Sequence, residues 1–228
     1  EMALWKDKSR RIIDHAGGIG TESIYLLEKG YCLDCTNEID PYFSKIAEER
    51  AKQGGFRLNI AHYNWLEYHK HFRKKSFDAG INVGSNHGYF STAEELGEAL
   101  DNLCWVLSPG GVYVADTRNT EYIWHEREKI LGGNFRYSAN YVYCENGVVG
   151  IPVRISDGTY DMEYTDVTTG KKAHICNLGL TLGLQKDLEK RFEKVFLFSD
   201  FKPGYDSRAD FFQFVCACRV QKTAVPVK

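Results

Sequence analysis

Short apolar runs alternate with helical patterns across the first half of the chain, and this alternation restricts the fold more than any other feature. Strand-like runs occupy residues 10–14, 31–37, 56–62, 76–84 and 110–119. Helical patterns stand between most of these runs, at 21–29, 41–52 and 92–107. Strands and helices that alternate at these lengths predict parallel strands with helices on both faces. We therefore expect an α/β fold with a doubly wound, mostly parallel sheet of seven strands.

The pattern changes after residue 134. Residues 135–180 carry alternating β-type runs, with the hairpin-type turns Asn146-Gly147 and Asp157-Gly158 between them. A helical pattern at 184–192 follows, and the last two strands are expected at 194–200 and 210–220. The insertion therefore interrupts the sheet before its last two strands.

This organisation predicts three parts of the chain. Residues 1–134 form the ligand-binding core, 135–182 form an antiparallel β insertion that covers the substrate site, and 183–228 return to the core sheet. Because the last strands complete the sheet only after the insertion, we expect the insertion to lie over one edge of the binding crevice.

The composition excludes several functions. A net charge of -2 and a sequence pI near 6.4 give no basic field for a phosphate backbone, which disfavours nucleic acid as a partner. No apolar run approaches the roughly 20 residues of a membrane helix, and no targeting pattern opens the sequence. Seven cysteines, an odd number, favour reduced thiols, so we expect a soluble cytoplasmic protein. The pairs Cys32/Cys35 and Cys216/Cys218 lie in strand-like runs, where we expect buried thiols and no metal.

The first strand ends in an acid that precedes a glycine turn. The pattern is Asp14-x-Ala16-x-Gly18-x-Gly20, with Ser23 where a dinucleotide-binding turn has its third glycine. Such a turn lets the backbone approach a ligand and directs helix N–H groups at it. A carboxylate beside it suits a ligand with a positive amino group better than a pyrophosphate. S-adenosylmethionine has such an ammonium and no phosphate, while the alternative is a purely structural turn.

Five stretches together have a counterpart in one family: DHAGGIGTESIYLLEKGY, YNWLEY, FDAGINVGSNHGYF, GGVYVADTRNTEYI and SDFKPG. On these stretches the chain resembles the Rossmann-like class I S-adenosylmethionine-dependent methyltransferases. More narrowly, it is similar to the glycine and glycine/sarcosine N-methyltransferases over about residues 10–220. The pattern GxxVxxDxRN together with SDFK is more specific than the glycine turn.

The resemblance implies where the cofactor would bind. The methionine side of the pocket would be formed by Asp14, Ala16, Gly18 and Gly20. The adenine would lie by Asn64 and Trp65, and the methionine moiety and sulfonium would be flanked by Gly84, Ser85 and Asn86. Ligands of open α/β sheets bind beyond the carboxyl ends of the strands, where these segments are expected. The alternative for Trp65 is an ordinary core aromatic.

The resemblance also implies that Arg118 and Asn119 face the methyl acceptor. The alternative for Asn119 is a cap of the helix that follows. The tyrosines of the insertion, Tyr143 among them, either line a pocket for an amine or fill the faces of hairpins. His87 either acts as a base or caps a backbone group.

Four features depart from the family's pattern. The family's acid at the end of the second strand is replaced by Asn37, with Glu38 beside it as a second candidate for the ribose hydroxyls. In the fourth-strand turn the order is Ser85-Asn86, followed by His87. No confident counterpart exists in the insertion for an arginine that clasps a carboxylate, and the candidates are Arg154 and Arg136. The segment before the first strand is short, so a lid would be disordered or come from another subunit of a homo-oligomer.

Methyl transfer needs alignment of the acceptor, the methyl group and the sulfur rather than a nucleophilic side chain. Our leading hypothesis is an enzyme that methylates the amine of a small metabolite, with glycine or sarcosine as the best guess. The first alternative is a small-molecule O-methyltransferase, and the second is a protein that binds S-adenosylmethionine without turnover. Base methylation of nucleic acid is disfavoured, because the fourth strand ends in GSNHGY and not in a proline-rich turn.

Overall fold

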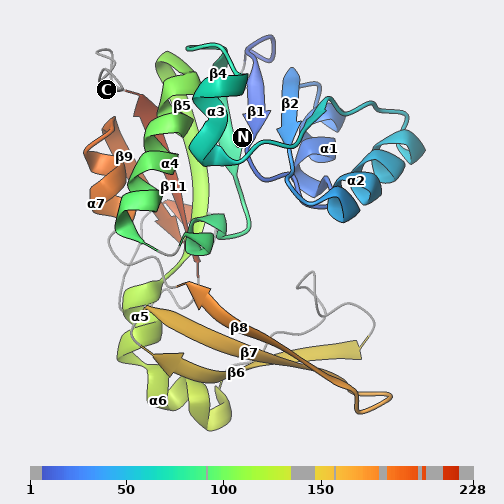
Figure 1. Ribbon diagram of the computed structural model, residues 1–228, viewed down its shortest axis with the longest axis vertical. Helices are drawn as coiled ribbons and strands as arrows, with labels where there is room; N and C mark the ends of the chain where they lie inside the picture. The colour runs from blue at the N-terminus through green and yellow to red at the C-terminus, as the bar shows by residue number, and fades with distance from the viewer. Residues whose placement is uncertain are drawn as a thin grey trace.

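Two β-sheets, one large and one small, organise the chain (Figure 1). The computed structural model describes residues 7–90, 92–134, 147–156, 158–179, 184–199, 202–203 and 213–220. The strands of the large sheet are β1 (Ile12–Asp14), β2 (Leu33–Asn37), β3 (Ile60–Ala61), β4 (Phe77–Asn82), β5 (Leu107–Arg118), β9 (Phe192–Ser199), β10 (Lys202–Pro203) and β11 (Gln213–Val220). The small sheet contains β6 (Val148–Ser156), β7 (Thr159–Asp166) and β8 (Lys172–Gly179).

The large sheet has the order β10-β9-β11-β5-β4-β1-β2-β3. The five strands from β5 to β3 are parallel, and β11 is antiparallel to both of its neighbours. The expected doubly wound, mostly parallel sheet is thus confirmed, but the expected number of seven strands is wrong. The eighth strand is β10, a two-residue edge strand that pairs antiparallel with β9. No pattern in so short a segment distinguishes it from a turn.

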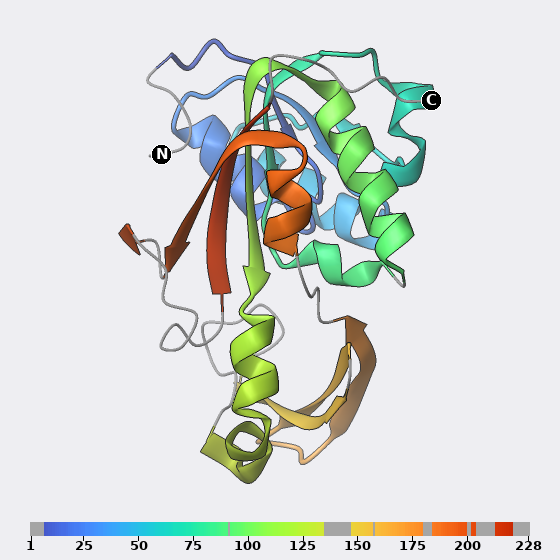
Figure 2. The ribbon, with the colours of Figure 1, turned by 90° about the vertical axis from the view of Figure 1, so that its left-hand side faces the viewer.

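Helices cover both faces of the large sheet, as the alternation predicted. The helical segments are α1 (Thr21–Glu28), α2 (Pro41–Gln53), η1 (Trp65–Glu67), α3 (Tyr68–His71), η2 (Asn86–Tyr89), α4 (Ala93–Val106), α5 (Thr120–His125), α6 (Arg127–Lys129), η3 (Ile130–Asn134) and α7 (Leu184–Glu189). Ile12 and Ile13 of β1 point to opposite faces, so Ile12 packs with α1 whereas Ile13 packs with α3, α4 and α7. Figure 2 shows α1 and α4 on opposite sides of the strands.

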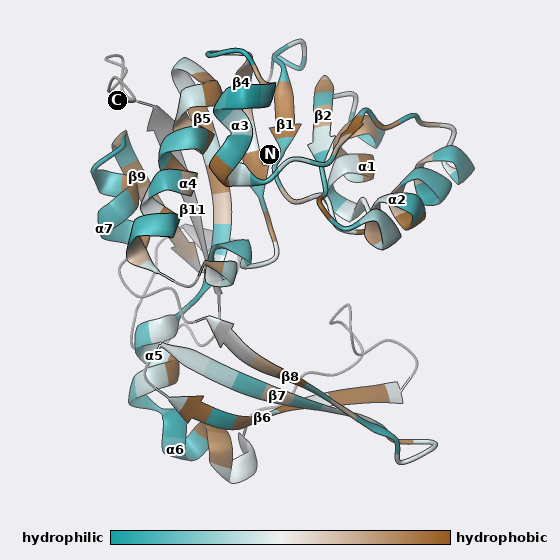
Figure 3. Cartoon of the chain, in the orientation of Figure 1, coloured by the Kyte–Doolittle hydropathy of each residue, from teal (hydrophilic) through white to brown (hydrophobic). Residues whose placement is uncertain are grey.

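Local sequence signals explain where two of these helices begin. The Asp40 side chain accepts a hydrogen bond from the Tyr42 N–H (2.8 Å), and Pro41 stands in the first turn of α2. The Thr92 hydroxyl accepts from the Glu95 N–H (3.1 Å) at the start of α4. The edge strand β3 is shorter than the predicted run at 56–62, because only Ile60 and Ala61 of that run pair with β2. In Figure 3 the buried strand β1 is largely hydrophobic, whereas α4 carries both hydrophilic and hydrophobic residues.

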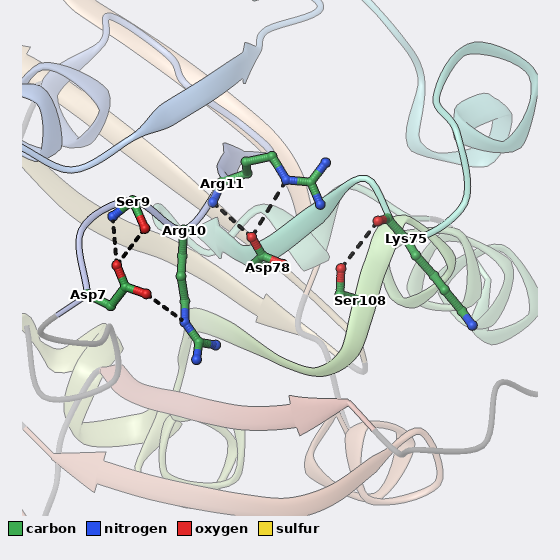
Figure 4. Close-up of polar contacts among 7 residues, drawn as sticks. All are labelled: Asp7, Ser9, Arg10, Arg11, Lys75, Asp78 and Ser108. Atoms are coloured by element: carbon green, nitrogen blue, oxygen red, sulfur yellow. Dashed lines mark hydrogen bonds and ion pairs between the residues drawn. The ribbon is translucent and has the colours of Figure 1, made fainter.

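Polar contacts at the amino ends of the strands fix the register of β1 against β4 (Figure 4). The Arg11 N–H donates to Asp78 Oδ2 (3.0 Å), and the Arg11 guanidinium lies 3.6 Å from the same oxygen. The Ser108 hydroxyl donates to the Lys75 carbonyl (3.2 Å), which holds the start of β5 beside the loop before β4. These contacts lie at the end of the sheet opposite to the segments with predicted ligand contacts.

The small sheet is antiparallel, in agreement with the hairpin patterns of the sequence. One of its faces packs against α5 and η3 through Ile123, Ile130, Tyr160, Met162 and Tyr164. In Figures 1 and 2 this sheet lies beyond the end toward which β5 points. The first predicted hairpin run, residues 135–144, lies outside the described residues. Among the described residues, no helix combines the length and apolar character that crossing a bilayer requires.

Candidate active site

The predicted ligand-binding segments gather at the carboxyl ends of β1, β2, β4 and β5. These four strands are neighbours in the sheet, and all run in the same direction. Their following loops therefore meet at one edge, on the side where the small sheet lies (Figure 1). Hydrogen bonds connect the ends of neighbouring strands and involve several of the predicted site residues.

The glycine turn after β1 has the backbone that its sequence implies. Gly20 has φ +81° at the start of α1, a conformation that side chains other than glycine rarely adopt. A Cβ at Gly17 would lie 2.2 Å from Thr36 Cγ2, so the turn lies directly against β2. The backbone conformation therefore requires glycine at position 20, and the packing against β2 requires it at position 17, whatever ligand binds there.

Asp14 lies at the end of β1 and is buried. Its carboxylate accepts hydrogen bonds from the Ser23 hydroxyl (2.7 Å) and the Ala16 N–H (3.3 Å). Burial raises the pKa of Asp14 to about 7, against the opposite effect of the Ser23 hydrogen bond. The sequence pattern missed the role of Ser23, which occupies the position of the third glycine and orients this carboxylate.

Asn37 and Glu38 at the end of β2 have different environments. The Asn37 amide donates to the carbonyls of His15 (3.2 Å) and Tyr63 (3.0 Å) and accepts from the Tyr63 N–H (3.0 Å), so it ties three strand ends together. Glu38 instead extends to the glycine turn, where Oε2 accepts from the Gly18 N–H (2.7 Å), and its Oε1 accepts from the Asp40 N–H (2.8 Å). Of these two residues, Glu38 is thus the one whose side chain extends to the glycine turn.

Asn64 and Trp65 follow β3. The Asn64 side chain caps η1 by accepting from the Leu66 N–H (3.0 Å). Trp65 is buried, belongs to the core cluster, and donates from Nε1 to the His15 carbonyl (2.9 Å). Its ring also lies edge-on to His87, with 6.1 Å between centroids. Trp65 is thus a core aromatic, and its hydrogen bond to the His15 carbonyl places it beside the residues that lead into the glycine turn.

The turn after β4 is held by a residue that the candidate site did not include. Asp116 of β5 accepts hydrogen bonds through Oδ1 from the N–H groups of Gly84 (2.8 Å) and Ser85 (2.7 Å). Ser85 has φ +60°, an unusual conformation for a residue other than glycine. Burial raises the pKa of Asp116, and the two N–H groups act in the opposite direction. The sequence carried a signal for Asp116, since it is the aspartate of the DxRN pattern.

His87 is buried in η2 against β5. Its Nε2 lies 2.9 Å from the Tyr113 hydroxyl and 3.2 Å from Asn82 Nδ2. Burial lowers the pKa of His87 to about 4, and an interaction with the Asp116 backbone acts weakly in the opposite direction. At neutral pH the imidazole is therefore uncharged.

Arg118 and Asn119 end β5 and begin the connection to the small sheet. The Arg118 guanidinium carbon lies 4.9 Å from the centre of the Tyr160 ring of β7, and the Arg118 N–H donates to the Ser85 hydroxyl (3.3 Å). The Asn119 side chain accepts from the Tyr122 N–H (3.1 Å) and so caps α5. Of the two interpretations of Asn119, the cap is observed, and it does not exclude contact with an acceptor.

Arg154 has an ion-pair partner within the small sheet. Arg154 of β6 forms a two-point ion pair with Asp161, with distances of 2.6 and 3.1 Å from its nitrogens to the two carboxylate oxygens. About half of its side chain remains exposed. Tyr143 and Arg136, the other two candidates from the insertion, lie outside the described residues.

Comparison with known proteins supports the resemblance stated from the sequence. The chain is 28% identical to a glycine/sarcosine N-methyltransferase of Halorhodospira halochloris, over 92% of this chain and 75% of that protein. It is 29% identical to the glycine N-methyltransferase of Rattus norvegicus, over 75% of this chain and 56% of that protein. No family model matches the chain.

Solved structures share the fold at low sequence identity. An S-adenosylmethionine-dependent methyltransferase from Clostridium acetobutylicum superposes with a TM-score of 0.66 at 14% identity, covering 92% of this chain and 84% of that one. An amino pentose methyltransferase from Micromonospora echinaspora, solved with S-adenosylmethionine bound, gives 0.61 at 16% identity over 93% and 85%. The chain is therefore a homologue of the glycine and glycine/sarcosine N-methyltransferases, built on the class I S-adenosylmethionine-dependent methyltransferase fold.

Proposed function

We propose that this chain is an S-adenosylmethionine-dependent N-methyltransferase that methylates the amine of glycine, sarcosine or a closely related small amino acid. One observation carries the proposal: the chain is 28–29% identical to proteins that are named for this activity. The segments with predicted ligand contacts follow neighbouring parallel strands of the large sheet. The loops at the carboxyl edge of this sheet place the carboxylates of Asp14 and Glu38 near the glycine turn and the guanidinium of Arg118 near the small sheet.

The cofactor is assigned to the half of this edge formed by β1, β2 and β3. Asp14 supplies negative charge beside the glycine turn for the ammonium of the methionine moiety. Glu38 is assigned to the ribose hydroxyls, because each of its oxygens accepts one N–H and a carboxylate has about four acceptor positions. Asn37 has its amide committed to backbone groups, so it acts as a brace between strand ends. Asn64 and Trp65 border the adenine end.

The acceptor is assigned to the half formed by β4 and β5. A guanidinium binds a carboxylate through two parallel hydrogen bonds, which suits an amino-acid substrate. Arg118 stands at the end of β5 next to the Ser85 turn, whereas Arg154 lies in β6 of the small sheet. We therefore assign the substrate carboxylate to Arg118, with the Tyr160 ring behind the guanidinium. Asn119, fixed by its capping bond, stands beside it.

The reaction needs a neutral amine. Its lone pair forms the N–CH3 bond while the S–CH3 bond breaks, and that bond's electron pair stays on sulfur, which becomes a neutral thioether. The product nitrogen then carries a positive charge and releases a proton to solvent. A tyrosine ring beside the acceptor stabilises the charge that builds on nitrogen, and we assign this part to Tyr160 because its ring lies against Arg118.

The first experiment is methyl transfer from labelled S-adenosylmethionine to a panel of glycine, sarcosine, dimethylglycine, other amino acids, simple amines and hydroxyl or carboxylate acceptors. We expect label on glycine or sarcosine. Label on a hydroxyl or carboxylate acceptor alone would replace the proposal with an O-methyltransferase. Cofactor binding without transfer to any acceptor would replace it with a non-catalytic binding role.

A pair of variants tests the assignment of the carboxylate. Arg118→Gln is expected to raise the KM for glycine by about 30-fold, since a hydrogen-bonded charge pair contributes about 2 kcal/mol. Arg154→Gln is the matched comparison and is expected to change this KM far less. A larger effect at Arg154 would move the carboxylate site into the insertion. A cytoplasmic location, from the odd number of cysteines, and a homo-oligomer are also proposed, and size-exclusion chromatography with light scattering tests the latter.

A further inference from the structure

A chain of buried hydrogen bonds joins β4, η2 and β5 below the turn that follows β4. We call its four residues, Asn82, Asn86, His87 and Tyr113, the η2 network. The Tyr113 hydroxyl lies 2.9 Å from Asn82 Nδ2 and 2.9 Å from His87 Nε2. Asn86 Nδ2 donates to Asn82 Oδ1 (2.9 Å) and to the Val83 carbonyl (2.8 Å). Asn82, His87 and Tyr113 have at most 1% of their surface exposed, so water does not compete for these bonds.

The bonds have one consistent direction. Because Asn82 Oδ1 accepts from Asn86, its Nδ2 faces Tyr113 and donates to the hydroxyl oxygen. Asn82 Nδ2, which can only donate, also lies 3.2 Å from His87 Nε2, so this nitrogen is the acceptor and the Tyr113 hydroxyl donates to it. This order requires a neutral imidazole with its proton on Nδ1. Burial supports the neutral form, since it holds the pKa of His87 near 4.

The network holds one side of the turn, and Asp116 holds the other. Asn86 ties the beginning of the turn to its end, through Asn82 and the Val83 carbonyl. Asp116 binds the N–H groups of Gly84 and Ser85 from β5. Between these two attachments Ser85 keeps φ +60°, a conformation that costs free energy and persists only when its surroundings enforce it.

We infer that Tyr113 and His87 are positioning residues that fix the Gly84–Asn86 turn for the bound sulfonium and its acceptor. The inference rests on the proposed function, which places the methionine moiety and sulfonium at this turn. His87 thereby acts as the acceptor of the Tyr113 hydrogen bond and not as a base. Tyr113 stands in the middle of β5, and its side chain acts on the turn through His87 and Asn82.

Matched variants test the inference. Tyr113→Phe removes the hydroxyl alone, and His87→Leu removes the acceptor, whereas His87→Gln keeps an acceptor near the position of Nε2. Tyr68→Phe is the control, because Tyr68 is equally buried in the same core cluster but its hydroxyl faces His15 (3.4 Å) and not the turn.

Two readouts are measured for each variant, namely the Kd for S-adenosylmethionine and hydrogen exchange of residues 83–89 in the free protein. We expect Tyr113→Phe and His87→Leu each to raise the Kd about five-fold and to speed this exchange, in line with the net value of one hydrogen bond. The double variant is expected to be no worse than either single variant, since both remove the same interaction. His87→Gln is expected to restore most of the affinity.

Three results would overturn the inference. These are a Tyr68→Phe effect as large as that of Tyr113→Phe, additive effects in the double variant, or a change in melting temperature with no change in exchange or Kd. Such results with a wild-type protein that binds S-adenosylmethionine would leave the proposed function intact. A wild-type protein that binds no S-adenosylmethionine would remove the proposed function, and faster exchange in Tyr113→Phe would then still show that the pair holds the turn.

Discussion

At the scale of single residues, hydrogen-bond partners distinguish the roles of two side chains that are adjacent in the sequence. The sequence makes Asn37 the first candidate for the ribose hydroxyls and Glu38 the second. The Asn37 amide is engaged by backbone groups of two other loops, and the Glu38 carboxylate lies on the glycine turn. Neighbouring residues at the end of a strand point to opposite sides, so their roles diverge although they are adjacent in the chain.

Two substitutions at the end of β2 are expected to affect different properties, one the affinity for the cofactor and the other the stability of the fold. Glu38→Gln keeps the shape of the side chain and should raise the Kd for S-adenosylmethionine about ten-fold with little change in melting temperature, since the charged acceptor is lost. Asn37→Asp loses both donated hydrogen bonds and should lower stability by about 2 kcal/mol. Isothermal titration and thermal melts measure the two effects. A weaker affinity of Asn37→Asp for S-adenosylmethionine, together with a lower stability of Glu38→Gln, would instead assign the ribose hydroxyls to Asn37.

Asp14 is expected to make cofactor binding depend on pH. Its pKa is raised to about 7 in the free protein, so about half of the molecules carry a neutral Asp14 at that pH. The ammonium of S-adenosylmethionine favours the anionic form, so the affinity should increase as the pH rises from 6 to 7.5. The Asp14→Asn variant removes the titration, and its Kd should stay flat over this range. An equally steep dependence in Asp14→Asn would assign the effect to another group.

At the scale of elements, the small sheet meets the core through a contact between two glycines. A Cβ built on Gly179, the last residue of β8, would lie 2.1 Å from the Gly88 carbonyl oxygen, and one built on Gly88 would lie 2.6 Å from the Gly179 carbonyl oxygen. Gly88 belongs to η2, directly after His87. The small sheet therefore packs on η2, next to the turn that the η2 network holds and where we propose that the acceptor binds.

Gly179→Ala is expected to separate these two elements by the width of a methyl group. The KM for the amine acceptor should rise several-fold while the Kd for S-adenosylmethionine changes little, because β1 and β2 are not touched. Gly132→Ala is the control, since no atom lies within 4 Å of a Cβ at Gly132 and its backbone does not require glycine. Equal steady-state kinetics of the two variants would show that the glycine contact does not set acceptor binding.

At the scale of the whole molecule, buried titratable groups tie stability to pH. His15 is fully buried over Gly80 of β4, and burial lowers its pKa to about 3, with a smaller contribution from His87. Below its ordinary pKa of 6.5 the unfolded chain protonates this histidine and the folded chain does not. Folding stability due to His15 is therefore lost as the pH falls from 6.5 toward 3. The raised pKa values of Asp14, Glu22 and Asp116 act in the opposite direction.

Comparison of wild type with His15→Gln isolates this contribution. The difference in the free energy of unfolding between the two should change by about 1.4 kcal/mol per pH unit below pH 6.5, in favour of the variant, and stay constant above it. Urea unfolding at a series of pH values measures it. A difference that does not vary with pH would mean that His15 titrates normally in the folded protein.

The sequence by itself determined the parallel core, the helices on both faces, the antiparallel insertion and the homology to glycine and glycine/sarcosine N-methyltransferases. The first three follow from periodicity, caps and turn residues, which are local properties of neighbouring residues, and the homology rests on the five stretches that resemble that family. Only the tertiary structure decided the eighth strand, which of Asn37 and Glu38 extends to the glycine turn, the ion pair of Arg154 with Asp161, and the contacts of His87 and Asp116 with the β4 turn. Each of these depends on side chains that meet from strands far apart in the chain, and no local pattern records which of them will be neighbours.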